Sequence, residues 1–340
     1  MARFGVLTGG GDCPGLNACI RAVVRYGADR GVSVLGFRDG WRGVLDGAAH
    51  QLSIEDVRGL LPRGGTILGT SGTQPSLIEG GPDLVRDAVG VHALDGFIVI
   101  GGEGTMGTSA AMSDVPVIGI PKTIDNDIVG TDASIGFWTA AQIATDSIDR
   151  LYSTAESHNR VMVCEVMGRT AGWIGITSGL AGGADVILIP EHAFDIESVC
   201  RRIRRIHSER RPFSIVVVSE GAAPVPGSMA PPEYALDENG WPRLGGIGAV
   251  VADEIHRRTH SETRVTTLGH VQRGGSPVAF DRVLATRLGA AAVDQAIKGG
   301  WGNLVGISGA DIVTTPLAEV GARASVVPPE RFRIPEILCT

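Results

Sequence analysis

Short apolar segments that run into glycine-rich or polar loops constrain the fold of this chain more than any other feature of its sequence. Phe4–Thr8 is such a segment, and the loop Gly9–Gly15 follows it. The apolar residues of the next stretch recur at helical spacing, at Leu16, Ile20, Val23 and Val24. A short buried strand that leads into an amphipathic helix is typical of a β-α unit. We therefore predict a strand over 4–8 and a helix that begins at Pro14.

The same pattern recurs along the chain. Gly96–Ile100 enters the loop Gly101–Thr105, and Val115–Ile120 enters Pro121–Asp127. In the later half we expect strands over 160–166, 186–189, 214–218 and 264–268, and a helix over 170–180. The Pro-, Gly- and acid-rich stretch 222–243 is expected to leave the core. This alternation predicts an α/β fold with doubly wound parallel sheets, whose ligands bind at the carboxyl ends of the strands.

Length and composition narrow the class of protein. The 340 residues exceed one average domain of roughly 100 to 200 residues, so we expect two α/β lobes. A net charge of −7 argues against a nucleic-acid partner. No run of about 18 apolar residues is present, so no membrane association is expected. The N-terminus lacks the layout of a signal peptide, and the five scattered cysteines favour reduced thiols, so we expect a cytoplasmic protein.

Two of the expected loops have features of phosphate and magnesium sites. The loop that includes Gly11 follows a strand and opens a helix, so its backbone N–H groups can face a phosphate. A tight structural turn is the alternative explanation. The second loop places Glu103 among glycines, where a carboxylate beside phosphate oxygens suits an intervening Mg²⁺. A solvated loop glutamate is the alternative there.

The third loop indicates proton transfer. Asp125 and Asp127 lie two residues apart just beyond a strand, with Lys122 and Thr123 nearby to hold an anion. One carboxylate can accept a proton from an attacking hydroxyl while the other orients the hydroxyl or a metal, as phosphoryl transfer requires. Turn formation by Asp and Asn side chains is the alternative.

Basic side chains near the later strands indicate a sugar-phosphate site. Arg160, Arg264 and Arg273, together with His270, offer fork-shaped and point donors that suit a phosphate. Pairing on the surface is the usual fate of a single arginine. Their shared placement at strand boundaries favours a common ligand.

Four segments together resemble the phosphofructokinase A family, in order and spacing, from Phe4 to about Arg333. They are Gly-Gly-Glu-Gly-Thr at 101–105, Pro-Lys-Thr-Ile-Asp-Asn-Asp at 121–127, Met-Gly-Arg at 167–169 and Gly-His-Val-Gln-Arg-Gly-Gly at 269–275. The chain is most similar to the actinobacterial branch, which includes both ATP-using and pyrophosphate-using enzymes.

The resemblance implies a role for each site residue. Asp125 would be the general base that deprotonates the 1-hydroxyl of fructose 6-phosphate, with Asp127 and Lys122 assisting, and Glu103 would hold Mg²⁺. The donor phosphates would be bound by Gly11, Gly102, Glu103, Gly104 and Thr105. The sugar would be surrounded by Thr123, Asp125, Met167, Gly168, Arg169 and Glu220. Its 6-phosphate would be held by Arg160, Arg264, His270 and Arg273.

The resemblance also implies an architecture. Residues 1–136 plus about 272–322 would form a nucleotide- and magnesium-binding lobe, and about 137–271 plus 323–340 a sugar-phosphate-binding lobe, with the active site in the cleft between them. Residues matching Arg160 and Arg264 reach across from an adjacent subunit in the family. A homodimer or homotetramer is therefore expected.

Two positions bear on the phosphoryl donor. Pyrophosphate-using relatives usually have Asp at the position of Gly104, where its charge and bulk intrude on the α-phosphate of ATP. Lys122 instead matches the pyrophosphate-type residue. A block excludes a donor whereas an attractive cation does not, so Gly104 favours ATP, with pyrophosphate as the alternative.

One departure from the family pattern bears on activity. Gly72 stands where the family usually has an arginine that contacts the transferred phosphoryl group, and losing such a cation lowers the rate. We expect an ATP-dependent 6-phosphofructokinase of glycolysis. Rival interpretations are a pyrophosphate-dependent enzyme and a catalytically weakened regulatory or sugar-phosphate-binding paralogue. A third interpretation is that the chain is related to NAD kinases or lipid kinases. That relationship would account for neither the Met-Gly-Arg nor the Gly-His-Val-Gln-Arg-Gly-Gly segment.

Overall fold

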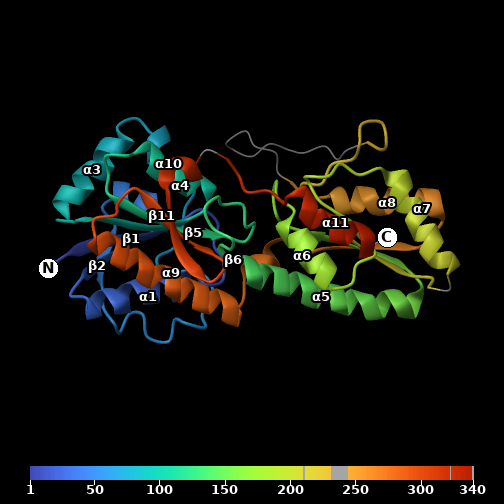
Figure 1. Cartoon of the computed structure of the whole chain (residues 1–340), viewed down its shortest axis with the longest axis horizontal. Coiled ribbons are helices and arrows are strands. Elements are labelled where there is room, and N and C mark those ends of the chain that lie inside the picture. Colours follow the sequence, from blue (N-terminus) through green and yellow to red (C-terminus); the bar gives the residue numbers. More distant parts are fainter. Residues whose placement is uncertain (210, 231–243, 322, 339–340) are drawn as a thin grey trace. The chain divides into compact units, whose positions relative to one another are not determined.

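The computed structural model describes residues 1–209, 211–230, 244–321 and 323–338. The chain divides into two compact units, Met1–Thr139 with Arg273–Ser325, and Ala140–Gln272 with Val326–Thr340 (Figure 1). Of the predicted excursion at 222–243, residues 231–243 lie outside the described part. Among the described residues, no helix has both the length and the apolarity that a membrane span requires.

The first unit is built on a mostly parallel sheet. Its strands are β1 (Arg3–Gly9), β2 (Ser33–Phe37), β3 (Ala49–Leu52), β4 (Gly96–Gly101), β5 (Val117–Thr123), β6 (Ile135–Gly136), β11 (Asn303–Ser308) and β12 (Asp311–Pro316). The order across the sheet is β12-β11-β5-β4-β1-β2-β3, with β6 paired to β5. Only the edge strands β3 and β12 pair antiparallel to their neighbours within the described sheet.

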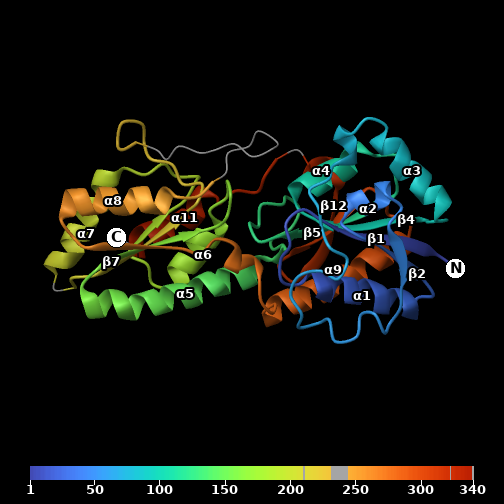
Figure 2. The ribbon, with the colours of Figure 1, turned by 180° about the vertical axis from the view of Figure 1, so that it is seen from behind.

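Helices cover both faces of this sheet. They are α1 (Leu16–Asp29), α2 (Trp41–Leu45), η1 (Pro75–Leu77), α3 (Gly81–Val91), α4 (Glu103–Ala111), α9 (Ala279–Ile297) and α10 (Leu317–Val320). α1 and α9 pack side by side on one face, in both views (Figures 1 and 2). The glycine at 289 allows this, because a Cβ there would lie 2.8 Å from that of Ala22 on α1.

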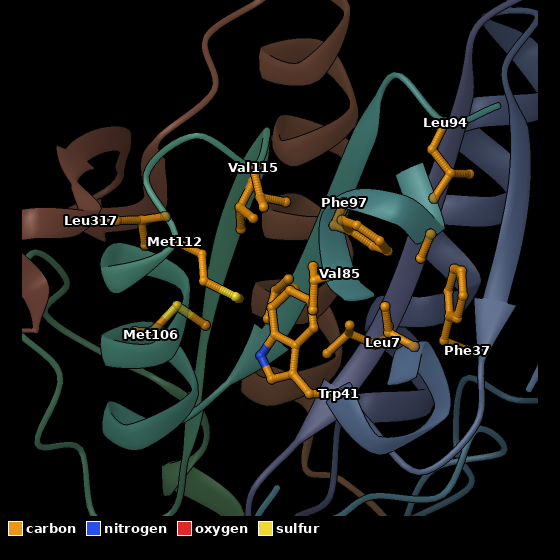
Figure 3. Close-up of a cluster of buried hydrophobic side chains, with 14 of the residues drawn as sticks. Leu7, Phe37, Trp41, Val85, Leu94, Phe97, Met106, Met112, Val115 and Leu317 are labelled. Carbon is orange, nitrogen blue, oxygen red and sulfur yellow. The ribbon is translucent and has the colours of Figure 1, made fainter. Parts of the chain in front are cut away.

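The opposite face carries a dense apolar core. Figure 3 shows Trp41 of α2, Val85 of α3 and Met106 of α4 around the sheet residues Leu7 and Phe97. Phe97 and Val99 of β4 belong to this cluster, whereas the alternate residues 98 and 100 face the other way and are equally buried. A central strand with both faces covered reads as a continuous apolar run, which is why β4 was recognisable in the sequence.

The second unit is a four-stranded parallel sheet in the order β10-β7-β9-β8. Its strands are β7 (Val161–Val166), β8 (Val186–Leu188), β9 (Ser214–Ser219) and β10 (Thr263–Thr267). Its helices are α5 (Phe137–His158), which begins in the first unit, α6 (Trp173–Ala181), α7 (Ile196–Ser208), α8 (Ile247–Thr259), the short η2 (Gly269–Arg273) and α11 (Pro329–Leu338). The core under α7 and α8 includes Val163, Leu188, Val199, Val216 and Val251. The predicted doubly wound α/β class is confirmed.

Several predicted boundaries were wrong. The first helix begins at Leu16, because Gly15 has a φ of 112° that a helix cannot contain. The segment 121–123 was expected in a loop but continues β5 as far as Thr123. Glu103, Gly104 and Thr105 were also expected in a loop, but they form the first turn of α4. α6 begins at Trp173 rather than at residue 170, and β7 begins one residue after Arg160.

Candidate active site

The strand order of the first unit fixes where a ligand can bind. From β1 the chain proceeds through α1 to β2, whereas from β4 it proceeds through α4 to β5 on the other side. The carboxyl ends of β1 and β4 therefore border a topological switch point, where open α/β sheets bind ligands. Gly9 pairs with Gly101, and Gly101 pairs with Pro121, so the three predicted loops start at neighbouring points of one edge.

Glycine is required in the β1–α1 loop because other side chains come close to it. A Cβ at Gly11 would lie 1.8 Å from Nη1 of Arg273, and this guanidinium also donates to the Asp12 carbonyl at 3.3 Å. The N–H of Gly10 is already bonded to the Ser71 carbonyl at 2.9 Å, so it does not serve a phosphate. The phosphate-binding role of Gly11 stays a prediction.

Two cationic side chains meet at this loop. Nζ of Lys122 donates to the Gly11 carbonyl at 2.5 Å and would lie 3.5 Å from a Cβ at Gly10. Burial lowers the pKa of Lys122, Cys13 and Asp125 raise it, and the positive charge of Arg273 lowers it further. Lys122 and Arg273 therefore gather positive charge at the edge of the sheet where an anionic donor is expected.

The first turn of α4 presents Glu103 and Gly104 at the same edge. Gly102 is the N-cap, and its carbonyl accepts from the Met106 N–H at 2.9 Å. The positive end of the helix dipole favours phosphate here. Thr105 is buried, and its side chain would contact a Cβ at Gly9 or Gly101 at 2.5–2.9 Å. Thr105 packs the two strand ends together.

The loop after β5 holds two buried carboxylates. Asp125 is 8% exposed and Asp127 is 4% exposed. The Thr123 hydroxyl donates to Oδ2 of Asp125 at 3.3 Å and accepts from the Asp125 N–H at 3.1 Å. Asn126 has a φ of 55°, and its Oδ1 accepts from the Ser134 N–H at 2.8 Å. The loop is thus held rigidly, and Asp125 is oriented by the adjacent threonine.

In the second unit, Arg160 and Arg264 share one carboxylate. Both guanidinium groups reach Oε1 of Glu262, at 2.9 Å and 2.5 Å respectively. The parallel pairing of β7 with β10 places Met162 opposite Arg264, so Arg160 lies two residues from that point. The structure brings these two predicted phosphate ligands together, while His270 lies on η2 with an exposed side chain.

The Met-Gly-Arg segment follows β7 and is fixed by Glu220. Oε1 of Glu220 accepts from the Arg169 N–H at 3.0 Å, and the Glu220 N–H donates to the Val166 carbonyl at 2.8 Å. Gly168 has a φ of 138° and Arg169 a φ of 54°, both in the left-handed region. Met167 is 9% exposed. The structure brings together the segment 167–169 and Glu220, because β7 and β9 are paired.

Sequence reasoning overlooked two side chains near these groups. Gln74 faces Gly104 from a segment without recognisable periodicity. Asp281 is fully buried and accepts from the N–H groups of Gly136 and Thr139 at 3.1 and 2.7 Å. An acidic residue in the first turn of a helix after Pro277 was the available signal for Asp281, and Gln74 gave none.

Comparison with known proteins agrees with this geometry. The family model described as Phosphofructokinase matches residues 3–296. The chain belongs to the phosphofructokinase family. Its membership confirms both the resemblance and the predicted enzyme class, a phosphotransferase.

Relatives of this phosphofructokinase carry two different names. The chain is 53% identical over 335 residues to the pyrophosphate–fructose 6-phosphate 1-phosphotransferase of Streptomyces coelicolor, covering 97% of each chain. It is 49% identical over 334 residues to the ATP-dependent 6-phosphofructokinase of Mycobacterium leprae, again covering 97% of each. Both kinds of relative are actinobacterial, as the mixed-substrate branch predicts.

Solved structures share the fold of this phosphofructokinase. The phosphofructokinase of Saccharomyces cerevisiae has a TM-score of 0.82 and 31% identity over 94% of this chain, which spans 45% of the yeast chain. The pyrophosphate-dependent phosphofructokinase of Marinobacter aquaeolei has a TM-score of 0.84 at 23% identity, covering 97% of this chain and 86% of that chain. The latter likeness concerns the fold alone.

Proposed function

We propose that this phosphofructokinase transfers a phosphoryl group from ATP to the 1-hydroxyl of fructose 6-phosphate, a glycolytic reaction that forms fructose 1,6-bisphosphate. The observation that carries the proposal is the placement of Asp125 directly after β5, on the sheet edge that also holds Gly11, Lys122 and the start of α4. A base and a phosphate-binding surface at one edge are the components that phosphoryl transfer needs.

In the proposed mechanism, Asp125 accepts the proton of the 1-hydroxyl as that oxygen attacks the terminal phosphorus of the donor. The Thr123 hydroxyl, which donates to Oδ2 of Asp125, orients the carboxylate for this step. Lys122 and Arg273 offset the negative charge of the donor, and Asp127 assists from the same rigid loop. The nucleoside diphosphate leaves as the bond between the oxygen of its β-phosphate and the transferred phosphorus breaks.

Magnesium is proposed as the metal, with Glu103 as its protein ligand. Mg²⁺ takes one or two carboxylates together with substrate phosphates, and it prefers such oxygen ligands. The described residues include no group of three or more His, Cys, Asp or Glu able to hold a metal by themselves. One carboxylate beside glycines suits an ion that is shared with donor phosphates. When bound, Mg²⁺ would screen the negative charge between the phosphate groups.

The sugar is proposed to bind at Thr123, Met167, Gly168, Arg169 and Glu220, with its 6-phosphate held by Arg160, Arg264, His270 and Arg273. Arg160 and Arg264 converge on Glu262, which indicates that both guanidinium groups can approach one anion. Because such residues come from an adjacent subunit in the family that the sequence resembles, we propose a homodimer or homotetramer. We also propose that the residues 1–136 with 272–322 bind the nucleotide, and that the enzyme acts in the cytoplasm.

Pyrophosphate is the second candidate donor, because of one observation. The ammonium group of Lys122 lies at the glycine loop, where it can attract a compact anionic donor. ATP is preferred because residue 104 is glycine, and an exposed glycine leaves room for a longer donor. Gly72 adds no cation, and a Cβ built there has no neighbour within 4 Å.

The test is formation of fructose 1,6-bisphosphate by the purified protein with Mg²⁺, with ATP and pyrophosphate compared. Asp125→Asn is the control for chemistry at this site, and it is expected to lower kcat by about 10²- to 10⁴-fold. Product from ATP that disappears in this variant supports the proposal. Product from pyrophosphate alone contradicts the ATP assignment, and no product from either donor favours the regulatory paralogue.

A further inference from the structure

The side chain of Gln74 faces the position that separates ATP from pyrophosphate in the proposed function. A Cβ built on Gly104 would lie 3.5 Å from Nε2 of Gln74 and 3.9 Å from its Cδ. Apart from its two chain neighbours, the amide nitrogen is therefore the side-chain atom nearest to a Cβ at Gly104. Gly104 itself is exposed, so the space beside it is open to a ligand.

The segment that carries Gln74 is fixed against α4. Gln74 directly precedes η1, and its carbonyl accepts from the Leu77 N–H at 3.0 Å. Ser76 of η1 has its Oγ 3.5 Å from Oγ1 of Thr108, one turn beyond Gly104 on α4. This contact keeps the residue before η1 beside the first turn of α4.

The amide of Gln74 has donors to offer. Its side chain is half-buried, and it makes no hydrogen bond to another described residue. Gly102 and Gly104, which flank Glu103 at this turn, carry no side chains. An amide NH₂ group supplies two donors, and phosphate oxygens are acceptors, so a phosphate beside Gly104 is the ligand that this group suits.

We infer that Gln74 is a donor-specificity residue: its Nε2 group donates a hydrogen bond to the α-phosphate of ATP beside Gly104. The inference rests on the proposed function and deepens it. Pyrophosphate consists of the transferred group and the leaving group alone, and it has no third phosphate at this position. A contact with the α-phosphate therefore strengthens binding of ATP without affecting pyrophosphate.

This role also fits the lack of a cation at position 72. Gly72 and Gln74 lie on the same segment, which bonds the glycine loop through the Ser71 carbonyl. A neutral amide gives a directional contact to a charged oxygen without adding positive charge beside Lys122 and Arg273. The segment thus contributes to the choice of donor even though it has no arginine.

Gln74→Ala tests the inference, with Leu77→Ala, whose side chain is exposed on the same segment, as the matched control. Losing one hydrogen bond to a charged oxygen is expected to lower kcat/KM for ATP about tenfold. The dissociation constant for MgATP, measured by calorimetry, is expected to rise by a similar factor. kcat/KM for pyrophosphate, where the wild type uses it, is expected to stay within about twofold. Leu77→Ala is expected to match the wild type with either ligand.

The possible outcomes separate the role of Gln74 from the proposed function. An equal loss with both donors, or an unchanged affinity for MgATP, overturns the role of Gln74. If the wild type makes no product from ATP, the proposed function fails, but a tenfold weaker MgATP complex in Gln74→Ala still supports the contact with Gln74. A wild type that does not bind MgATP contradicts both.

Discussion

Lys122 shows how a single residue combines charge with burial. It is 2% exposed, and burial lowers the pKa of its ammonium group. An ordinary lysine remains protonated to about pH 10.4, so Lys122 loses its proton at a lower pH than its unfolded counterpart. The positive charge of Lys122 is therefore lost at a lower pH than that of an exposed lysine.

This tuning predicts an alkaline limit to activity. As pH rises through the lowered pKa, the cation that attracts the donor is lost, so kcat/KM for the donor should fall. In Lys122→Arg the guanidinium stays charged, and the alkaline limb should move to higher pH. Profiles of kcat/KM against pH for the two proteins check this. Superimposable alkaline limbs would show that Lys122 does not set the limit.

The same shift predicts a dependence of stability on pH. Between the lowered pKa and about 10.4, the unfolded chain binds more protons at Lys122 than the folded chain does, so the free energy of unfolding gains from a rise in pH. Lys122→Met removes this contribution. The free energy of unfolding, measured with urea at several alkaline pH values, should rise less with pH, or fall more steeply, in the variant than in the wild type. The same pH dependence in both proteins would contradict this prediction.

Glu262 predicts a competition with the sugar phosphate. It pairs with Arg160 and Arg264, and the hydrogen bond from Arg160 lowers the pKa of its carboxyl group. Glu262→Gln removes a negative charge from the proposed phosphate site. Exposed ion pairs contribute about 0.2–1 kcal/mol, so KM for fructose 6-phosphate should fall by up to about fivefold.

Glu254→Gln is the control for this change. Glu254 also pairs with two arginines, Arg257 and Arg258, but at the end of α8 rather than with the proposed phosphate ligands. The KM of the Glu254→Gln variant for fructose 6-phosphate should equal that of the wild type. A rise in KM in Glu262→Gln would mean that Glu262 positions the arginines more than it competes for them.

At the scale of elements, the start of α9 is joined to the start of α5 through Asp281. The carboxylate accepts from Gly136 N–H, Thr139 N–H and the Thr139 hydroxyl, the last at 2.5 Å. Burial raises the pKa of Asp281, and these hydrogen bonds lower it. A buried acceptor with three donors is costly to replace, because each lost partner leaves a buried polar group unsatisfied.

Asp281→Asn should therefore lower the free energy of unfolding by about 1–3 kcal/mol, since its NH₂ group faces hydrogen-bond donors. Asp294→Asn, on the same helix, is the control. Asp294 is partly exposed and contacts Tyr26 and Arg30. Replacing it with Asn should therefore change the free energy of unfolding by no more than about 0.5 kcal/mol. Urea unfolding compares the two, and equal losses would contradict a special role for Asp281.

The elements that sequence predicted correctly share a physical cause. β1, β4 and β9 are buried on both faces, so their apolar runs stand out between glycines. The start of α4 was predicted as loop because glycine at 102, 104 and 107 lowers local helix propensity. Tertiary packing outweighs that preference, since Thr105 of the first turn packs against the glycines that end β1 and β4.

The parts of the site that sequence could not predict depend on contacts between distant segments. Arg273 meets Gly11 across more than 250 positions of sequence, and nothing in either segment specifies the other. The approach of Gln74 to Gly104 likewise depends on how η1 packs on α4. By contrast, the Asp125 loop was recognisable because its carboxylates and its strand are adjacent in sequence.

At the scale of the whole molecule, the proposed oligomer predicts complementation. If Arg264 serves the site of an adjacent subunit, Asp125→Asn and Arg264→Ala remove different parts of each site. Hybrids of the two variants then contain sites with both parts intact. Co-expressed dimers that assemble at random should recover about a quarter of wild-type activity.

Purified hybrids, isolated through two different affinity tags, provide the measurement. Each parent alone is the control for residual activity. Hybrids no more active than the two parents would show that Arg264 acts within its own subunit.

The division of the chain also bears on the order in which the protein is made. Met1–Thr139 belongs to a unit whose remaining part, Arg273–Ser325, contains α9 and the edge strands β11 and β12. During synthesis the ribosome releases all four strands of the other sheet before α9 appears. The first unit therefore cannot complete its fold until the second sheet has emerged. Until then, the face of α1 that α9 covers remains exposed. For that interval a nascent chain exposes an apolar helix surface, and this is the point in its synthesis where a chaperone that binds such surfaces would act.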